Sequence, residues 1–209
     1  MNWGTFPCQK KRSLKKLSDK NGNLFIISSV AGGGKSTLIG LLLKKYPDIL
    51  FSVSYTSRPI RGGDIEGKSY HFVSKEKFED LVVKNYFYEW AQVHDNYYGT
   101  PKEFIEKNLL DGKKIILDID VQGADKVKAH LPSSVSIFIV PPSREIWVER
   151  LKNRGTDDPL VIEKRIRNGL HELEAQDRFD FRIVNEHLDK ALHELESIIL
   201  ENEKPNPKI

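Results

Sequence analysis

The chain has 209 residues, of which 39% are hydrophobic and 30% are charged, and this length and composition fit one globular domain with a sizeable core. No apolar run approaches the ~20 residues that a membrane-spanning helix needs, and the single cysteine, Cys8, excludes an internal disulfide bond. Because no basic-then-apolar signal segment opens the chain, we expect a cytoplasmic protein.

The formal charge of +3 is concentrated near the N-terminus. Residues 1–22 hold six lysines and arginines against one aspartate, a net charge of +5, which leaves 3 − 5 = −2 for the rest of the chain. A nearly neutral remainder argues against a basic face that binds nucleic acid. We therefore expect a basic flexible leader at 1–22, whose role stays open, and neither a nucleic-acid nor a membrane partner.

From residue 23 onward, short β-rich apolar runs alternate with helical patterns, which is typical of an α/β fold with a mostly parallel sheet. The pattern predicts five strands, at 24–28, 49–53, 114–119, 135–140 and 181–184. It predicts helices at 35–46, 75–85, 101–110, 122–129, 144–154, 159–178 and 188–203. The stretch 54–100 breaks the alternation because it is rich in Gly, Tyr, Asp and Arg, so it indicates an insertion into the core.

A glycine-rich turn links the first predicted strand to the first predicted helix. Its residues are Ser29, Val30, Ala31, Gly32, Gly33, Gly34, Lys35, Ser36 and Thr37. A strand, a glycine-rich turn, Gly-Lys-Ser-Thr and a helix form the context of a loop whose backbone N–H groups cradle phosphates. We expect these nine residues to bind ATP, with Lys35 reaching the β- and γ-phosphates and the Ser36 hydroxyl ligating Mg²⁺. Ser29 stands where the pattern usually has glycine.

The predicted strand 114–119 contains and is followed by carboxylates. Asp118 lies near its end and Asp120 just beyond it. An apolar strand that ends in a carboxylate places a hard anion beside the phosphates, where it can orient Mg²⁺ or its waters. Asp118 is the first choice for this metal role and Asp120 is the second.

Five further motifs resemble those of the guanylate kinase family, in order along the chain from about residue 23 to about residue 203. They are FSVSYTSRPIR at 51–61, GKSYHF at 67–72, EWA at 89–91, NYYGT at 96–100 and LDIDVQG at 117–123. Asp64 and Ile60 depart from the family pattern, which commonly has glutamate and proline there.

The resemblance implies an α/β, P-loop nucleoside-monophosphate-kinase-like core with a five-stranded parallel sheet, a GMP-binding insertion and a lid. On this division the domain covers 23–204. The core segments are 23–53, 101–142 and 170–204, the insertion is 54–100, the lid is 143–169, and a tail follows at 205–209.

The resemblance also implies which residues bind GMP. Arg58 and Arg61, with Tyr70 and Tyr98, would hold its phosphate, and two arginines suit a dianion because their N–H groups form charge-assisted pairs with it. The same GMP-binding set includes Asp118.

For the base, the informative residue is Glu89. Guanine presents two adjacent donors, N1–H and the exocyclic amine, and one carboxylate can accept from both. Ser54 and Thr100 match the guanine contacts of the family and would complete the pocket. By the same resemblance, Arg154 and Arg165 belong to a lid over ATP, and they join Lys35 and Arg58 as the predicted catalytic residues.

The activity implied is Mg²⁺-dependent transfer of the γ-phosphate of ATP to GMP, and also to dGMP, giving ADP and GDP in purine nucleotide metabolism, by a monomer or a homodimer. One alternative is a non-catalytic guanylate-kinase-like module that binds proteins, although such modules typically lack the lysine that stands here as Lys35. Another is a kinase of the same fold that acts on a sugar phosphate, which would have no use for a guanine pocket.

Overall fold

The computed structural model describes residues 22–93, 95–152 and 159–202. The predicted leader, apart from its last residue, and the predicted tail lie outside these residues, as does Arg154. Within the described ranges, no helix is long and apolar enough to cross a membrane.

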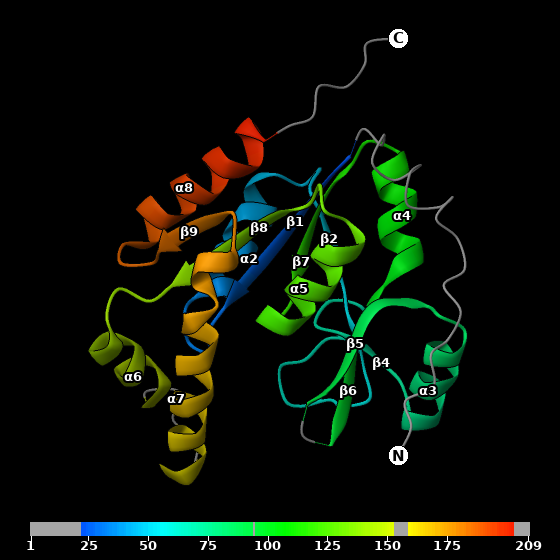
Figure 1. The fold of residues 1–209 in the computed structure, drawn as a ribbon, viewed down its shortest axis with the longest axis horizontal. Helices are drawn as coiled ribbons and strands as arrows, with labels where there is room; N and C mark the ends of the chain where they lie inside the picture. The colour runs from blue at the N-terminus through cyan, green and yellow to red at the C-terminus, as the bar shows by residue number, and fades with distance from the viewer. Residues whose placement is uncertain (1–21, 94, 153–158, 203–209) are drawn as a thin grey trace.

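A five-stranded parallel sheet forms the centre of the molecule (Figure 1). Its strands are β1 (Asn23–Ser29), β2 (Leu50–Ser52), β7 (Lys114–Asp118), β8 (Val135–Val140) and β9 (Phe181–Val184), in the spatial order β2-β7-β1-β8-β9. These strands agree with the five predicted ones within two residues at each end. The expectation of an α/β fold with a five-stranded parallel sheet is confirmed.

Helices surround this sheet. They are α2 (Lys35–Lys45), α4 (Lys102–Leu110), α5 (Val121–His130), α6 (Arg144–Lys152), α7 (Pro159–Glu174) and α8 (Leu188–Glu201). The prediction of one helix over 159–178 is wrong at its end, because α7 stops at Glu174 and a 3₁₀ turn covers Gln176–Arg178. The N–H groups of Ala175 and Arg178 donate to carbonyls three residues back, so the chain tightens from α-helical to 3₁₀ geometry there.

The alternation of side chains along β1 divides the core into two layers. Phe25 and Ile27 pack with residues of α2 and α8, such as Leu38 and Leu195. Neighbouring Leu24 and Ile26 instead join a cluster that includes residues of α4 and α5. Because β1 is buried on both faces, it presents its carboxyl end, where the glycine-rich turn begins, at a rigid edge of the sheet.

A second, four-stranded sheet is built from residues 55–101. Its strands are β3 (Tyr55–Thr56), β4 (His71–Phe72), β5 (Phe87–Val93) and β6 (Asn96–Pro101), in the order β4-β3-β6-β5. Phe78 of α3 (Lys75–Val83) stacks on Phe87 with ring centroids 4.7 Å apart, which fixes this helix against the sheet. In Figure 1 this unit lies at the lower right, while α6 and α7 lie at the lower left.

Candidate active site

The glycine-rich turn leads from β1 into α2, as the sequence predicts. Gly32 and Gly34 have φ angles of 83° and 92°, a region that side chains with a Cβ rarely adopt. Lys35 is the first residue of α2, and its ammonium group forms an ion pair with Asp118 at the end of β7. The pair forms because β1 and β7 are adjacent parallel strands whose carboxyl ends meet at one edge.

Serine fits at the first position of the turn. The Ser29 hydroxyl donates to the Ile139 carbonyl oxygen at 2.8 Å, so this buried side chain has a polar partner. A Cβ atom on Gly33 would lie 2.0 Å from the Ser29 hydroxyl oxygen, so a larger residue at position 33 would require this hydroxyl to move away from Ile139. Serine at position 29 and glycine at position 33 thus fit together.

The residues predicted to hold Mg²⁺ supply the right kind of ligand atoms. Ser36 is exposed in the first turn of α2, and Asp118 offers a carboxylate near the same turn through its pair with Lys35. Mg²⁺ prefers such oxygen ligands and usually keeps several waters. No group of three or more His, Cys, Asp or Glu in the described parts of the chain could hold a metal ion.

One cavity of about 270 Å³ lies between the edge of the central sheet and the second sheet. Its lining includes six residues of the predicted site: Lys35, Ser54, Tyr70, Glu89, Tyr98 and Asp118. Asp120, the second choice for the metal role, also lines it, but its Oδ1 accepts from the Gly123 N–H at 2.7 Å and caps α5. One oxygen of Asp120 is thus already used by the fold.

Glu89 reaches this cavity from β5 and is 9% exposed. Burial raises the pKa of its carboxyl group, and a hydrogen bond from Thr100 opposes that rise only in part. The Thr100 hydroxyl donates to Glu89 Oε1 at 2.7 Å from the paired strand β6. This bond orients the buried carboxylate of Glu89. Thr100 donates to Oε1 and not to Oε2.

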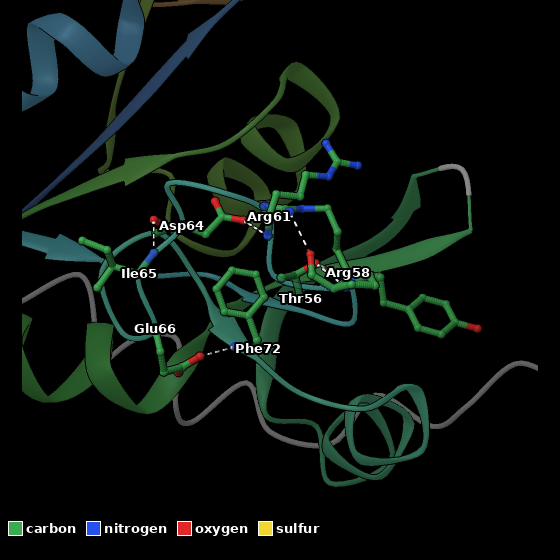
Figure 2. Close-up of polar contacts among 10 residues, drawn as sticks. Thr56, Arg58, Arg61, Asp64, Ile65, Glu66 and Phe72 are labelled. Carbon is green, nitrogen blue, oxygen red and sulfur yellow. Dashed lines mark hydrogen bonds and ion pairs between the residues drawn. The ribbon is translucent and has the colours of Figure 1, made fainter. Parts of the chain in front are cut away.

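Arg58 is held before any ligand arrives. It is 8% exposed, and its Nη1 donates to Asp64 Oδ2 at 2.9 Å, while its guanidinium carbon lies 5.4 Å from the Tyr70 ring centroid and 5.5 Å from that of Phe72. Figure 2 shows the loop around this pair, in which the backbone N–H of Arg61 also donates to Asp64 Oδ2, at 2.8 Å. The cation holds the pKa of Asp64 below its usual range.

Three of the predicted arginines lie outside the lining of the cavity. The exposed Arg61 and the buried Arg58 do not line the cavity, although Arg58 contacts Tyr70, which does. Arg165 lies half-buried on α7 and is not part of the cavity lining either. In the sequence, Asp64 differs from the family pattern but carries no sign of its pairing with Arg58. Its spacing of six residues from Arg58, in a loop, gives no periodic signal.

A glycine-rich turn with Gly-Lys-Ser-Thr at the edge of a parallel sheet, with a polar cavity between it and a second sheet, is typical of P-loop kinases of the nucleoside monophosphate class. The sequence model of the guanylate kinase family matches residues 21–202. The chain belongs to the guanylate kinase family, as the motifs predict.

Individual relatives agree with this assignment. A guanylate kinase from Pseudoalteromonas translucida is 46% identical over 184 residues, covering 88% of this chain and 89% of the relative. One from Shewanella oneidensis is 48% identical over 179 residues, covering 85% and 86%. The crystal structure of guanylate kinase from Anaplasma phagocytophilum superposes with a TM-score of 0.73 at 32% identity, covering 90% of this chain and 89% of that one.

Proposed function

We propose that this chain transfers the γ-phosphate of ATP to GMP, and also to dGMP, giving ADP and GDP in purine nucleotide metabolism. The observation that carries the proposal is the single cavity that Lys35 and Asp118 share with Glu89, Ser54, Tyr70 and Tyr98. It brings a phosphate-binding cation next to a buried carboxylate that suits guanine. Curated relatives at 42–48% identity over most of the chain support guanylate kinase function and do not favour a non-catalytic module.

On the donor side, residues 29–37 would bind the phosphates of ATP through backbone N–H groups, the positive end of α2 and Lys35. Ser36 and Asp118 would hold Mg²⁺, which when bound neutralises charge on the phosphates. Arg165, and Arg154 outside the described residues, would add positive charge from the lid. Phosphoryl transfer asks the protein mainly to align the reactants, neutralise charge and exclude water.

On the acceptor side, Arg58, Arg61, Tyr70 and Tyr98 would hold the phosphate of GMP. The buried Arg58 pairs with Asp64, so its guanidinium is already desolvated and loses little freedom when it binds an anion. Glu89 would accept both donors of guanine, supported by Thr100, with Ser54 completing the pocket. A sugar phosphate offers no base donors, so the buried Glu89 carboxylate would keep only its bond from Thr100 and lose its partners on the ligand, which is costly.

We also propose how the chain is divided into segments. We assign the core to 23–53, 101–142 and 170–204, the GMP-binding insertion to 54–100 and the lid to 143–169, with a leader at 1–22 and a tail at 205–209. A cytoplasmic location, a monomer or homodimer, and partners limited to ATP and GMP complete it.

The direct test is to identify the product. The purified full chain is incubated with ATP, GMP and MgCl₂, and nucleotides are separated by anion-exchange chromatography, with a parallel sample containing excess EDTA. We expect equal amounts of GDP and ADP, and neither with EDTA. ADP without GDP would mean hydrolysis instead of transfer, and GDP formation in EDTA would refute the metal requirement.

A further inference from the structure

Two carbonyl oxygens of the phosphate-binding turn accept hydrogen bonds from side chains far away in the sequence. Trp147 Nε1 donates to the Ala31 carbonyl at 2.7 Å, and Asn185 Nδ2 donates to the Gly33 carbonyl at 2.9 Å. The sequence separations are 116 and 152 residues. The turn is thus held by two side chains that lie far from it in the sequence.

The indole of Trp147 has almost no freedom to turn. It is 0% exposed and belongs to a buried cluster with Val30 and Leu151. A Cβ atom on Gly169 of α7 would lie 2.3 Å from the indole ring, so α7 packs against it as closely as a glycine allows. Trp147 therefore links the turn both to α6, on which it lies, and to α7, which carries Arg165. The two helices lie side by side in Figure 1.

Asn185 lies directly after β9 and is also fixed by the fold. It is 6% exposed, and its own backbone N–H donates to the Val140 carbonyl at 2.8 Å. A Cβ atom on Gly34 would lie 2.1 Å from Asn185 Nδ2, so the amide occupies the space beside this glycine. Arg150 of α6 donates to the Asn185 carbonyl at 3.3 Å, which links the helix that carries Trp147 to the segment that carries Asn185.

Because the peptide group is planar, each of these two bonds also fixes the direction of the N–H group that follows the carbonyl. In a trans peptide the carbonyl and the following N–H point in opposite directions. A carbonyl of Ala31 that points at Trp147 therefore turns the N–H of Gly32 away from that indole. A carbonyl of Gly33 that points at Asn185 likewise turns the N–H of Gly34 away from that amide. N–H groups of such turns are the donors that bind phosphate.

We propose that Trp147 and Asn185 are positioning residues that fix two peptide planes of the phosphate-binding turn and so set its affinity for ATP. The inference rests on the proposed function and deepens its donor half. Neither side chain needs to touch the nucleotide for this role. Because Gly32 follows the first carbonyl and the second lies between Gly33 and Gly34, the turn has little intrinsic preference for the productive orientation and relies on these distant donors.

The test uses the full chain with Trp147→Phe, which removes the N–H donor and keeps an aromatic ring, and Asn185→Ala. The matched control is Phe138→Leu, which loses aromatic volume from the same buried cluster as Trp147. For each protein we measure the thermal midpoint, KM for ATP and for GMP, and the Kd for MgATP by calorimetry. We expect each positioning variant to raise KM and Kd for ATP about 5- to 10-fold, the effect of losing one hydrogen bond, with KM for GMP changed less than about twofold.

Two results would overturn the inference: equal changes in the two KM values, or the same ATP-selective change in Phe138→Leu at similar loss of thermal midpoint. If Trp147→Phe does not fold, Asn185→Ala carries the same expectation, since that substitution removes no apolar side chain from the core. The wild-type protein in the same assay tests the proposed function separately. Transfer to GMP by the wild type with unaltered ATP binding in both variants would refute only the positioning role.

Discussion

Glu89→Gln tests how the base is read. Glu89 is 9% exposed and its carboxylate accepts from Thr100 at 2.7 Å, so the protein itself fixes the orientation of this acceptor. Glutamine keeps the shape but gives up the charge and one acceptor, and its amide nitrogen would face a donor of guanine. We expect kcat/KM for GMP to fall and kcat/KM for AMP to fall less or to rise, because adenine presents an acceptor at N1 that the carboxylate repels.

The size of the effect follows from the hydrogen bonds involved. A hydrogen bond to a charged group contributes about 1.5–3 kcal/mol, and an unpaired buried group costs about 1–3 kcal/mol. A loss in this range corresponds to about 10- to 100-fold in kcat/KM for GMP, since each 1.4 kcal/mol is about tenfold. An exposed glutamate would give a much smaller loss, so the magnitude also reports on burial.

The assay is coupled ADP release with GMP and AMP in both proteins. An unchanged GMP/AMP ratio would refute the assignment of Glu89 to the base. The pH dependence adds a second test: because burial raises the pKa of Glu89, protonation removes an acceptor at a higher pH than for an ordinary glutamate. The activity of the wild type with GMP should therefore decline on acidification along a limb that Glu89→Gln lacks, while titration of the GMP phosphate affects both proteins alike.

Three other predictions follow from the same site. Lys35→Ala should leave a folded protein whose turnover is at least about 100-fold lower, because the turn loses its charge on the β- and γ-phosphates; comparable turnover with folding verified by circular dichroism would contradict the mechanism. Thr100→Val should raise the pKa of Glu89 further, since Thr100 supplies the hydrogen bond that lowers it, so the acid limb with GMP should move to higher pH; an unmoved limb would show that this bond does not support the carboxylate. Deleting residues 1–20 should change kcat/KM by less than about tenfold because β1 begins at Asn23, and a larger loss would place the leader in the working enzyme.

The local pattern of the sequence predicted most of the central fold. Strands β8 and β9 coincide with their predicted bounds because both are short apolar runs bounded by polar or turn residues. The order β2-β7-β1-β8-β9 does not follow from any local pattern, since crossover connections set it. Strands β3 and β4 have two residues each, too few to show an alternation, and the longer β5 and β6 do not alternate cleanly between apolar and polar residues, so the sequence indicates this sheet only as an insertion.

For the site, the motifs predicted the residues that lie within them. They did not predict residues that reach the site only through tertiary contacts. Lys35 and Asp118 follow from a turn motif and a strand end, and the adjacency of β1 and β7 brings them together. Neither Trp147 nor Asn185 lies in a recognised motif. A tryptophan in an amphipathic helix and an asparagine after a strand indicate core packing and a turn, and only the tertiary structure brings them to the phosphate-binding turn.

The measurement that tests the central claim most directly is a coupled ADP-release assay of the wild-type full chain across GMP, dGMP, AMP, CMP, UMP and a ribose phosphate, at fixed MgATP. The account predicts rapid turnover with GMP, activity with dGMP, and at least about 10³-fold lower kcat/KM with the other acceptors, because none of them presents the two adjacent donors of guanine to Glu89. Similar turnover with all nucleotides, or with the sugar phosphate, would contradict a guanine-specific site, and no turnover with any of them would contradict a kinase.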